Sequence, residues 1–307
     1  MTDCRPCLHR FAVFVAAATL ALLVAGGLVT STASGDAVPD WWFAPISFGK
    51  LLPPMVGKVF FEHGHRLVGS SIGLLVLALA IAVTWSDPRR WMKRLAWAAF
   101  AMVVFQGCLG GFRVERIWSP KAVAIVHACV AQAIFCVLVA IAAYTSQAWN
   151  EARPLAGAAS VARWGTAATC VVFLQLVLGA VFRHTRIGLW AHAGFAGVVA
   201  VVAIGAAIVA LGAFRGVRLV ARPAKVLLGV LALQIGLGVA TWWALANGYT
   251  HSIDAQRIDV AIVTGHLAVG AMLLASAVWL AVSGRRLAWA PASDSPTRRL
   301  VPAEARR

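Results

Sequence analysis

Long apolar runs separated by short polar segments make up most of the chain. A helix needs about 20 apolar residues to cross a bilayer core, and eight runs reach that length: residues 11–30, 59–84, 95–112, 122–144, 161–182, 187–213, 224–245 and 259–282. The first run is longer than a usual signal-peptide core, and no small-residue cleavage site follows it promptly, so it counts as a span. The pattern predicts an all-α, polytopic membrane protein with eight transmembrane helices.

Composition supports this class. Of the 307 residues, 61% are hydrophobic and 12% are charged, and the mean hydropathy is +0.82. Soluble domains carry roughly 25% charged residues. The net charge of +16 does not indicate a nucleic-acid binder, because the basic residues stand in short segments between apolar runs. We therefore expect the lipid bilayer as a partner and no nucleic acid.

The positions of Lys and Arg predict the orientation. With the N-terminus inside, the outward-facing segments hold only nine of the 27 basic residues: Lys50, Lys58, Arg66, Arg113, Arg116, Lys121, Arg183, Arg186 and Arg257. The positive-inside rule then predicts that both termini are cytoplasmic. The lack of an extended Arg- and Ser-rich leader favours a bacterial plasma membrane over a mitochondrial one. Residues 286–307 are expected to form a flexible cytoplasmic tail.

An internal repeat divides the spans into two sets. Three spans carry a Gln-x-x-Leu-Gly segment, and the span after each carries a histidine: QGCLG at 106–110 before His127, QLVLG at 175–179 before His192, and QIGLG at 234–238 before His266. The first two spans have AGG at 25–27 and then His65. We predict two pseudo-symmetric four-helix bundles, residues 1–150 and 151–285.

The four repeat histidines share one depth. His127, His192 and His266 each lie four to seven residues, or roughly 6–10 Å, inside the outer end of their span, and His65 begins its span at the same side. A lone histidine is usually a core residue, but polar groups in spans are costly and mark functional paths. Imidazole pairs across a four-helix bundle can hold haem iron. Zinc is an alternative, although its sites need three or four converging ligands.

The stretch FFEHGHRLVGS at 60–70 adds a carboxylate to this layer. Glu62 lies three residues before His65, so both project from one helix face. Glu62 can orient the imidazole, take protons or stabilise a cation on a bound substrate; the alternative is an i,i+4 pair with Arg66. We predict the chemical role. His63 projects elsewhere and is predicted to be an interface residue.

Arginines also gather at the outer ends of spans. Guanidinium groups bind carboxylates in a bidentate manner, which suits haem propionates. The candidates for propionate contacts are Arg66, Arg113, Arg183 and Arg186. Ordinary headgroup contact is the alternative for each. The long first outer loop carries Trp41 and Trp42, which suit a lid at the membrane interface.

Taken together, these segments resemble the haem A synthase family over nearly the whole chain. The resemblance rests on five stretches: GGLVTSTASGDAVPDWW at 26–42, EHGHR at 62–66, FQGCLGG at 105–111, LQLVLGAVFRHT at 174–185 and LQIGLGVAT at 233–241. It implies a membrane oxidoreductase that oxidises the C8 methyl of haem O to a formyl group by successive hydroxylations. The product, haem A, serves terminal oxidases, so the family belongs to cytochrome oxidase assembly.

The resemblance also implies roles for individual residues. His65 and His127 would flank the substrate haem O in the first half, and His192 and His266 would ligate a haem B cofactor in the second. Glu62 would be the catalytic carboxylate. The implied partners are the enzyme that makes haem O and an electron donor of unknown identity, and a homo-oligomer is compatible with the family.

Two features depart from the family pattern. Some bacterial members have cysteine pairs in the outer loops, and this chain has none there. Ser70 stands where many members have Arg. The CRPC pair of Cys4 and Cys7 has no partner pair, and Cys108, Cys129, Cys136 and Cys170 lie in apolar runs, where a thiol acts as a small hydrophobe.

Three other classes compete with the synthase. A di-haem b-type cytochrome carrying electrons from quinol would use the same four histidines, and Glu62 one turn from His65 favours an enzyme over it. A repeat-built transporter is disfavoured because the spans show few Pro breaks and no acidic pair at the midplane. The third alternative is a membrane protein without a cofactor.

Overall fold

The computed structural model describes residues 5–40, 45–247 and 253–289, and these residues form nine helices. The helices are α1 (Arg5–Ser31), α2 (Gly57–Ser86), α3 (Arg90–Val114), α4 (Pro120–Thr145), α5 (Gln147–Glu151), α6 (Ala158–Thr185), α7 (Leu189–Phe214), α8 (Arg218–Asn247) and α9 (Ile253–Ala288). All except the short α5 are long and apolar enough to cross a membrane. The prediction of an all-α protein with eight spans is confirmed.

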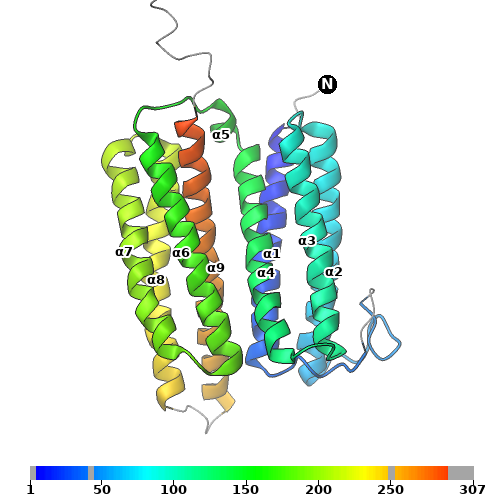
Figure 1. Cartoon of the computed structure of the whole chain (residues 1–307). Helices are drawn as coiled ribbons and strands as arrows, with labels where there is room; N and C mark the ends of the chain where they lie inside the picture. The colour runs from blue at the N-terminus through cyan, green and yellow to red at the C-terminus, as the bar shows by residue number, and fades with distance from the viewer. Residues whose placement is uncertain (1–4, 41–44, 248–252, 290–307) are drawn as a thin grey trace, which may run out of the picture.

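The long helices stand as two bundles side by side (Figure 1). In the first bundle α1 contacts α2, α2 contacts α3, α3 contacts α4, and α4 closes the ring on α1. Helices α6 to α9 repeat this order, with α9 closing on α6. The bundles meet where α1 and α4 face α6 and α9, and α5 lies in the connection between them. This shared order supports the prediction of two related halves.

A repeated backbone feature links the two halves. Helix α1 is followed by Ala33 at φ +50°, and α6 ends at Arg186 at φ +63°. Non-glycine residues rarely adopt this left-handed conformation. Each lies seven residues after a glycine of the repeat, Gly26 or Gly179. A left-handed residue therefore follows both helices within two positions, as Arg116 at φ +53° also follows α3.

Small residues set the closest helix contact. A side chain at Gly165 of α6 would come within 2.8 Å of the Ala281 backbone, and one at Gly284 of α9 within 2.7 Å of the Ala162 backbone. Only glycine permits this approach, which is a common way to pack helices in a membrane. Helix α9 runs on to Ala288 with Leu287 buried, and the remainder of the predicted tail lies outside the described residues.

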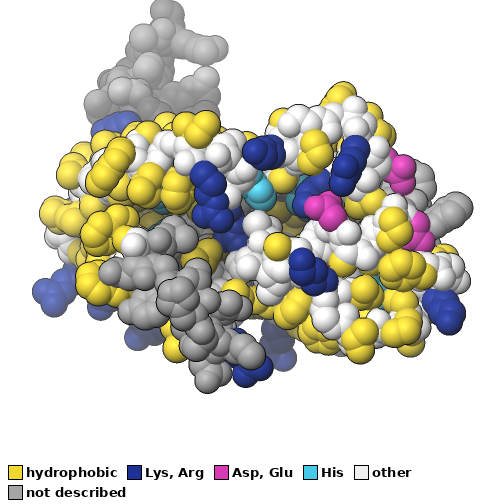
Figure 2. Space-filling view, turned by 90° about the horizontal axis from the view of Figure 1, so that it is seen from below, with side chains coloured by type: hydrophobic (Ala, Val, Ile, Leu, Met, Phe, Trp, Pro, Cys, Tyr) yellow, Lys and Arg dark blue, Asp and Glu magenta, His cyan; other side chains and the backbone are white. Residues whose placement is uncertain are grey.

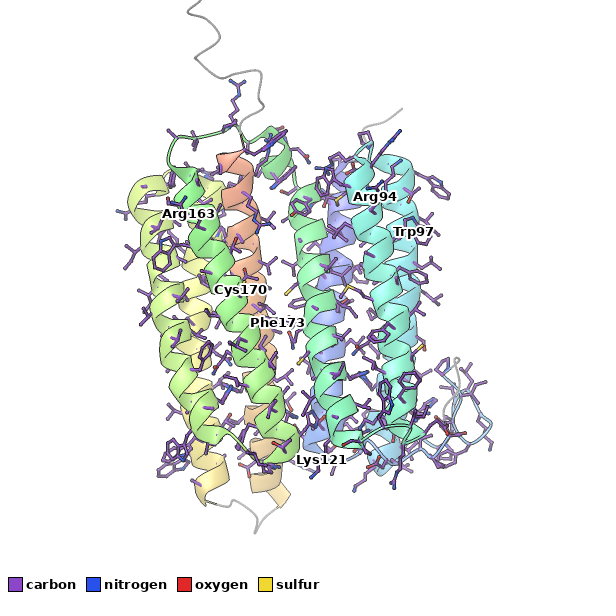
Figure 3. The ribbon with its side chains drawn as sticks, in the orientation of Figure 1. Arg94, Trp97, Lys121, Arg163, Cys170 and Phe173 are labelled. Atoms are coloured by element: carbon purple, nitrogen blue, oxygen red, sulfur yellow. The ribbon has the colours of Figure 1, made fainter. Side chains whose placement is uncertain are left out.

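The two ends of the molecule differ. Arg94 and Arg163 lie near the end that carries α5, whereas Lys121 lies at the opposite end (Figure 3). Lys121 is the second residue of α4, and His127 lies about two turns into the same helix. We call these the α5 end and the histidine end.

Candidate functional site

Each of the four repeat histidines packs against a glycine of the preceding long helix. A Cβ added at that glycine would lie close to the histidine Cε1 atom: 3.1 Å for Gly26 and His65, 3.8 Å for Gly110 and His127, 3.0 Å for Gly179 and His192, and 3.3 Å for Gly238 and His266. The same glycine–histidine contact therefore occurs four times in the structure. This contact includes the first pair of spans, where the Gln motif is missing.

The glutamines of the repeat hold the same helix turns. Gln106 Nε2 donates to the backbone oxygen of His127 at 2.9 Å, and Gln175 Nε2 donates to that of His192 at 2.9 Å. Gln234 Nε2 instead lies 3.4 Å from the ring Nε2 of His266. Each glutamine is four residues before its glycine, so the two residues lie on the same helix face and contact the same neighbouring helix. Together they fix the position of the histidine.

The structure brings the four histidines together two by two. The rings of His192 and His266 lie 6.3 Å apart between centroids, with planes at 84°. His65 and His127 are close enough to interact electrostatically. The Nδ1 atoms of all four are buried and have no hydrogen-bond partner among the described residues. Buried polar atoms are normally satisfied, so each of these four nitrogens is available to a partner from outside the described residues.

The C-terminal pair fits a metal held between two imidazoles. Two nitrogen–metal bonds of about 2 Å each, on opposite sides of one ion, place the ring centres about 6 Å apart. No group of three or more His, Cys, Asp or Glu side chains able to hold a metal occurs within the described part of the chain. The donor set therefore suits a haem iron, whose other ligands come from the porphyrin, better than zinc.

Glu62 is buried and fully engaged in hydrogen bonds. Its Oε2 accepts from the backbone N–H groups of Ala37 at 2.7 Å and Val38 at 2.9 Å, and its Oε1 accepts from Arg66 at 2.9 Å. The i,i+4 ion pair that stood as the alternative for this carboxylate is therefore present. Glu62 thus joins the start of α2 to the described part of the first loop (residues 32–40 and 45–56).

Arg66 and His63 bind the same loop. Arg66 donates to the backbone oxygens of Asp40 at 2.7 Å and Val38 at 3.4 Å. His63 is fully buried, with Nδ1 2.7 Å from Ser47 Oγ and Nε2 2.8 Å from the Leu51 oxygen. The prediction that His63 is an interface residue was wrong, because the loop folds back over this face of α2. The candidate lid residues Trp41 and Trp42 lie outside the described residues.

Arg113 and Arg183 also contact backbone. Arg113 of α3 donates to the Gly35 oxygen at 2.6 Å. Arg183 of α6 donates to the Gly27 oxygen at 2.8 Å and to Ser31 Oγ at 2.7 Å, so it ties the second bundle to α1. Arg186, the last of the four predicted propionate contacts, is exposed at the end of α6.

His184 is a residue of this site that the sequence analysis missed. It interacts electrostatically with Arg113, Arg183 and Arg186, and also with His127 of the first bundle. We call Arg113, Arg183, His184 and Arg186 the central basic cluster. In the view onto the histidine end, His, Lys and Arg side chains come to the surface between the two bundles (Figure 2). The sequence signal that could have revealed His184 was its position next to Arg183 at the end of a span.

The described cysteines form no disulfide bond with one another. Cys7, Cys108, Cys129, Cys136 and Cys170 are free thiols. Cys170 lies midway along α6 (Figure 3). Cys4 lies outside the described residues, so the pairing of Cys4 with Cys7 stays untested.

Fold and site together define a polytopic membrane protein with two histidine pairs at one end of two four-helix bundles. The model of the COX15-CtaA family, described as cytochrome oxidase assembly protein, matches residues 51–193. The chain is similar to this family over the matched segment, which is 143 of its 307 residues. The matched segment includes Glu62, His65, His127 and His192 and stops before His266.

Relatives agree with the family match. A heme A synthase of Symbiobacterium thermophilum is 33% identical over 169 residues, which are 52% of this chain and 53% of the relative. A heme A synthase of Alkalihalophilus pseudofirmus is 32% identical over 124 residues, 39% of this chain and 40% of the relative. One from Shouchella clausii is 34% identical over 110 residues, 34% of each. The chain thus spans about a third to a half of the length of these relatives.

Proposed function

We propose that this protein is a haem A synthase that oxidises the C8 methyl of haem O to a formyl group. The observation that carries the proposal is the two histidine pairs, each placed by a glycine contact and each with buried, unpartnered Nδ1 atoms, in a chain whose residues 51–193 match this family's model. In a structural protein without a cofactor, four buried ring nitrogens without hydrogen-bond partners would be destabilising, because buried polar atoms are normally hydrogen-bonded.

In this proposal His192 and His266 hold haem B in the second bundle. When bound, haem B supplies one-electron transfer to the substrate site. Gly179 and Gly238 let the two rings approach, and Gln175 fixes the helix turn that carries His192. The protein thereby presents two preorganised nitrogens, which reduces the entropy cost of binding the cofactor.

The first bundle would receive the substrate. His65 and His127 would flank haem O, and Glu62, one turn from His65, would be the carboxylate of the pocket. The first loop, held by Glu62, His63 and Arg66, would close the pocket against water. Water exclusion strengthens the electrostatic effect of a carboxylate on a developing cation.

The central basic cluster would receive carboxylates. A buried cation without an acidic partner is costly, and Arg183 has only a carbonyl and a hydroxyl as hydrogen-bond partners among the described residues. Haem propionates supply the missing negative charge. We propose this role first for Arg183 and Arg186, and then for Arg113 and Arg66, which already have Asp36 at 3.7 Å and Glu62 at 2.9 Å as acidic neighbours.

The remaining assignments follow from the same proposal. The protein would lie in a bacterial plasma membrane with both termini cytoplasmic and the histidine end outward. The enzyme that makes haem O and an electron donor would be its partners, and it would act as a monomer or a homo-oligomer.

The direct test is to express the full chain in cells that supply haem O and to identify the extracted haems by chromatography and mass spectrometry. Haem A is expected with the native protein and not with a His65→Ala variant. Haem O and haem B without haem A, from a well-folded native protein, would refute the synthase.

A second candidate is a di-haem b-type cytochrome that transfers electrons without altering its haems. The observation that favours it is the engagement of both Glu62 oxygens with the first loop and Arg66. Haem B at two equivalents per chain, with no haem A, would support this candidate.

The glycine contact gives a prediction for the cofactor site. In a Gly179→Val variant the Cβ would lie 3.0 Å from His192 Cε1, so the ring must shift away from its partner. We expect haem B per purified protein to fall about tenfold, in the range seen when groups around a metal ligand are changed. The readout is the haem absorbance per protein. Gly229→Val is the control, because a Cβ at Gly229 meets nothing within 4 Å.

A further inference from the structure

A groove opens between α7 and α8 at the α5 end, far from the histidine layer. Its volume is about 420 Å³. Ile204, Ile208, Leu211 and Leu228 form its apolar lining, and the side chain of Ile208 is 65% exposed. Gly212 also lines it, and a Cβ there would meet nothing within 4 Å. The groove is therefore accessible to a lipid molecule from the bilayer.

The mouth of the groove is basic. Arg215 follows the last residue of α7, and Lys225 lies near the start of α8; both are exposed. None of the described residues that line the groove is acidic, and neither cation makes an ion pair with another described residue. Two cations thus stand together where the apolar helices leave the membrane.

The length of the groove matches one leaflet. From Ile204 to Arg215 is eleven residues, or about 16 Å along a helix at 1.5 Å per residue. Half of a hydrocarbon core is about 15 Å. An acyl chain lying along the isoleucines would therefore place its phosphate beside Arg215 and Lys225.

We propose that this groove is a binding site for an anionic phospholipid of the leaflet at the α5 end. The charge selects the headgroup, because basic pockets between membrane helices bind anionic headgroups whereas a zwitterionic lipid carries its own cation. The apolar slot receives one acyl chain. The site is independent of the proposed synthase activity, so each can fail without the other.

The experiment uses the purified full chain in detergent and native mass spectrometry with rising lipid concentration. The probes are phosphatidylglycerol and phosphatidylcholine with identical acyl chains. We expect phosphatidylglycerol to bind at least about tenfold more tightly, since each cation contributes attraction to an anionic surface. The double variant Arg215→Gln/Lys225→Gln is expected to lose this preference. Equal binding of the two lipids to the native protein would overturn the proposal.

Two further variants complete the test. Arg94→Gln/Arg163→Gln removes two exposed arginines at the same end but outside the groove, and it should keep the lipid preference (Figure 3). If it loses the preference as the groove variant does, the effect is general surface charge and the site is refuted. Gly212→Leu fills the slot and should weaken binding of both lipids several-fold. Unchanged binding in that variant, with the circular dichroism of the native protein, would rule out the acyl slot.

Discussion

Replacing His266 with alanine is expected to abolish haem B binding to the purified protein. The ring centroids of His266 and His192 lie 6.3 Å apart, a spacing that would suit two imidazoles on a shared iron. The substitution would remove one of the two nitrogens that would hold this iron. We therefore expect more than the 10- to 100-fold loss of affinity that follows changes around a ligand. Haem B per protein, measured by absorbance after extraction, gives the result.

A matched histidine tests the specificity of that loss. His9 of α1 lies at the α5 end, where its ring Nδ1 is 3.0 Å from the Ala142 oxygen. His9→Ala should keep full haem B, because His9 has the ordinary role of a bonded core histidine. His65→Ala should also keep haem B, since His65 belongs to the other bundle. Full haem B in His266→Ala would contradict the assignment of the second bundle.

The spans and the histidine layer were predictable from the sequence for physical reasons. A bilayer imposes a minimum length on each apolar helix, so eight runs predicted eight helices. Each histidine follows a glycine in the preceding span, and all four histidines lie at a similar depth. This repetition predicted that they form pairs. The contact of Gly26 with His65 extends this rule to spans that lack the Gln motif. The pattern of glycines and histidines in successive spans was therefore enough to locate the site.

The first loop was not predictable in the same way. Its contacts join residues 8 to 28 positions apart through backbone atoms, as with Glu62 and the amide of Ala37 or Arg66 and the oxygen of Asp40. The sequence does not indicate which backbone groups a side chain will contact. His63 was therefore predicted to lie at the membrane interface, although it is buried under the loop. His184 was missed for a related reason, because its neighbours Arg113 and His127 come from the other bundle.

Replacing Glu62 with glutamine is expected to stop haem A formation while the first loop stays in place. Glutamine keeps a carbonyl oxygen that can accept from the Ala37 and Val38 amides in place of Oε2, whereas its NH2 group replaces Oε1 and cannot accept from Arg66. It lacks the negative charge that a proton acceptor or a cation-stabilising group needs. Removing such a group costs about 100-fold or more in rate. Extracted haem A per protein is the first readout, and tryptic cleavage at Lys50, an exposed loop residue, is the second.

A His63→Ala variant separates the two roles of this stretch. It removes the ring that holds Ser47 and the Leu51 oxygen but leaves the Glu62 carboxylate intact. Faster cleavage at Lys50 is therefore expected, with a much smaller loss of haem A than in Glu62→Gln. If Glu62→Gln made haem A at the native rate, the carboxylate would have no part in the chemistry. If Glu62→Gln instead opened the loop as far as His63→Ala does, holding the loop would account for its effect, because charge loss alone leaves the amide contacts available.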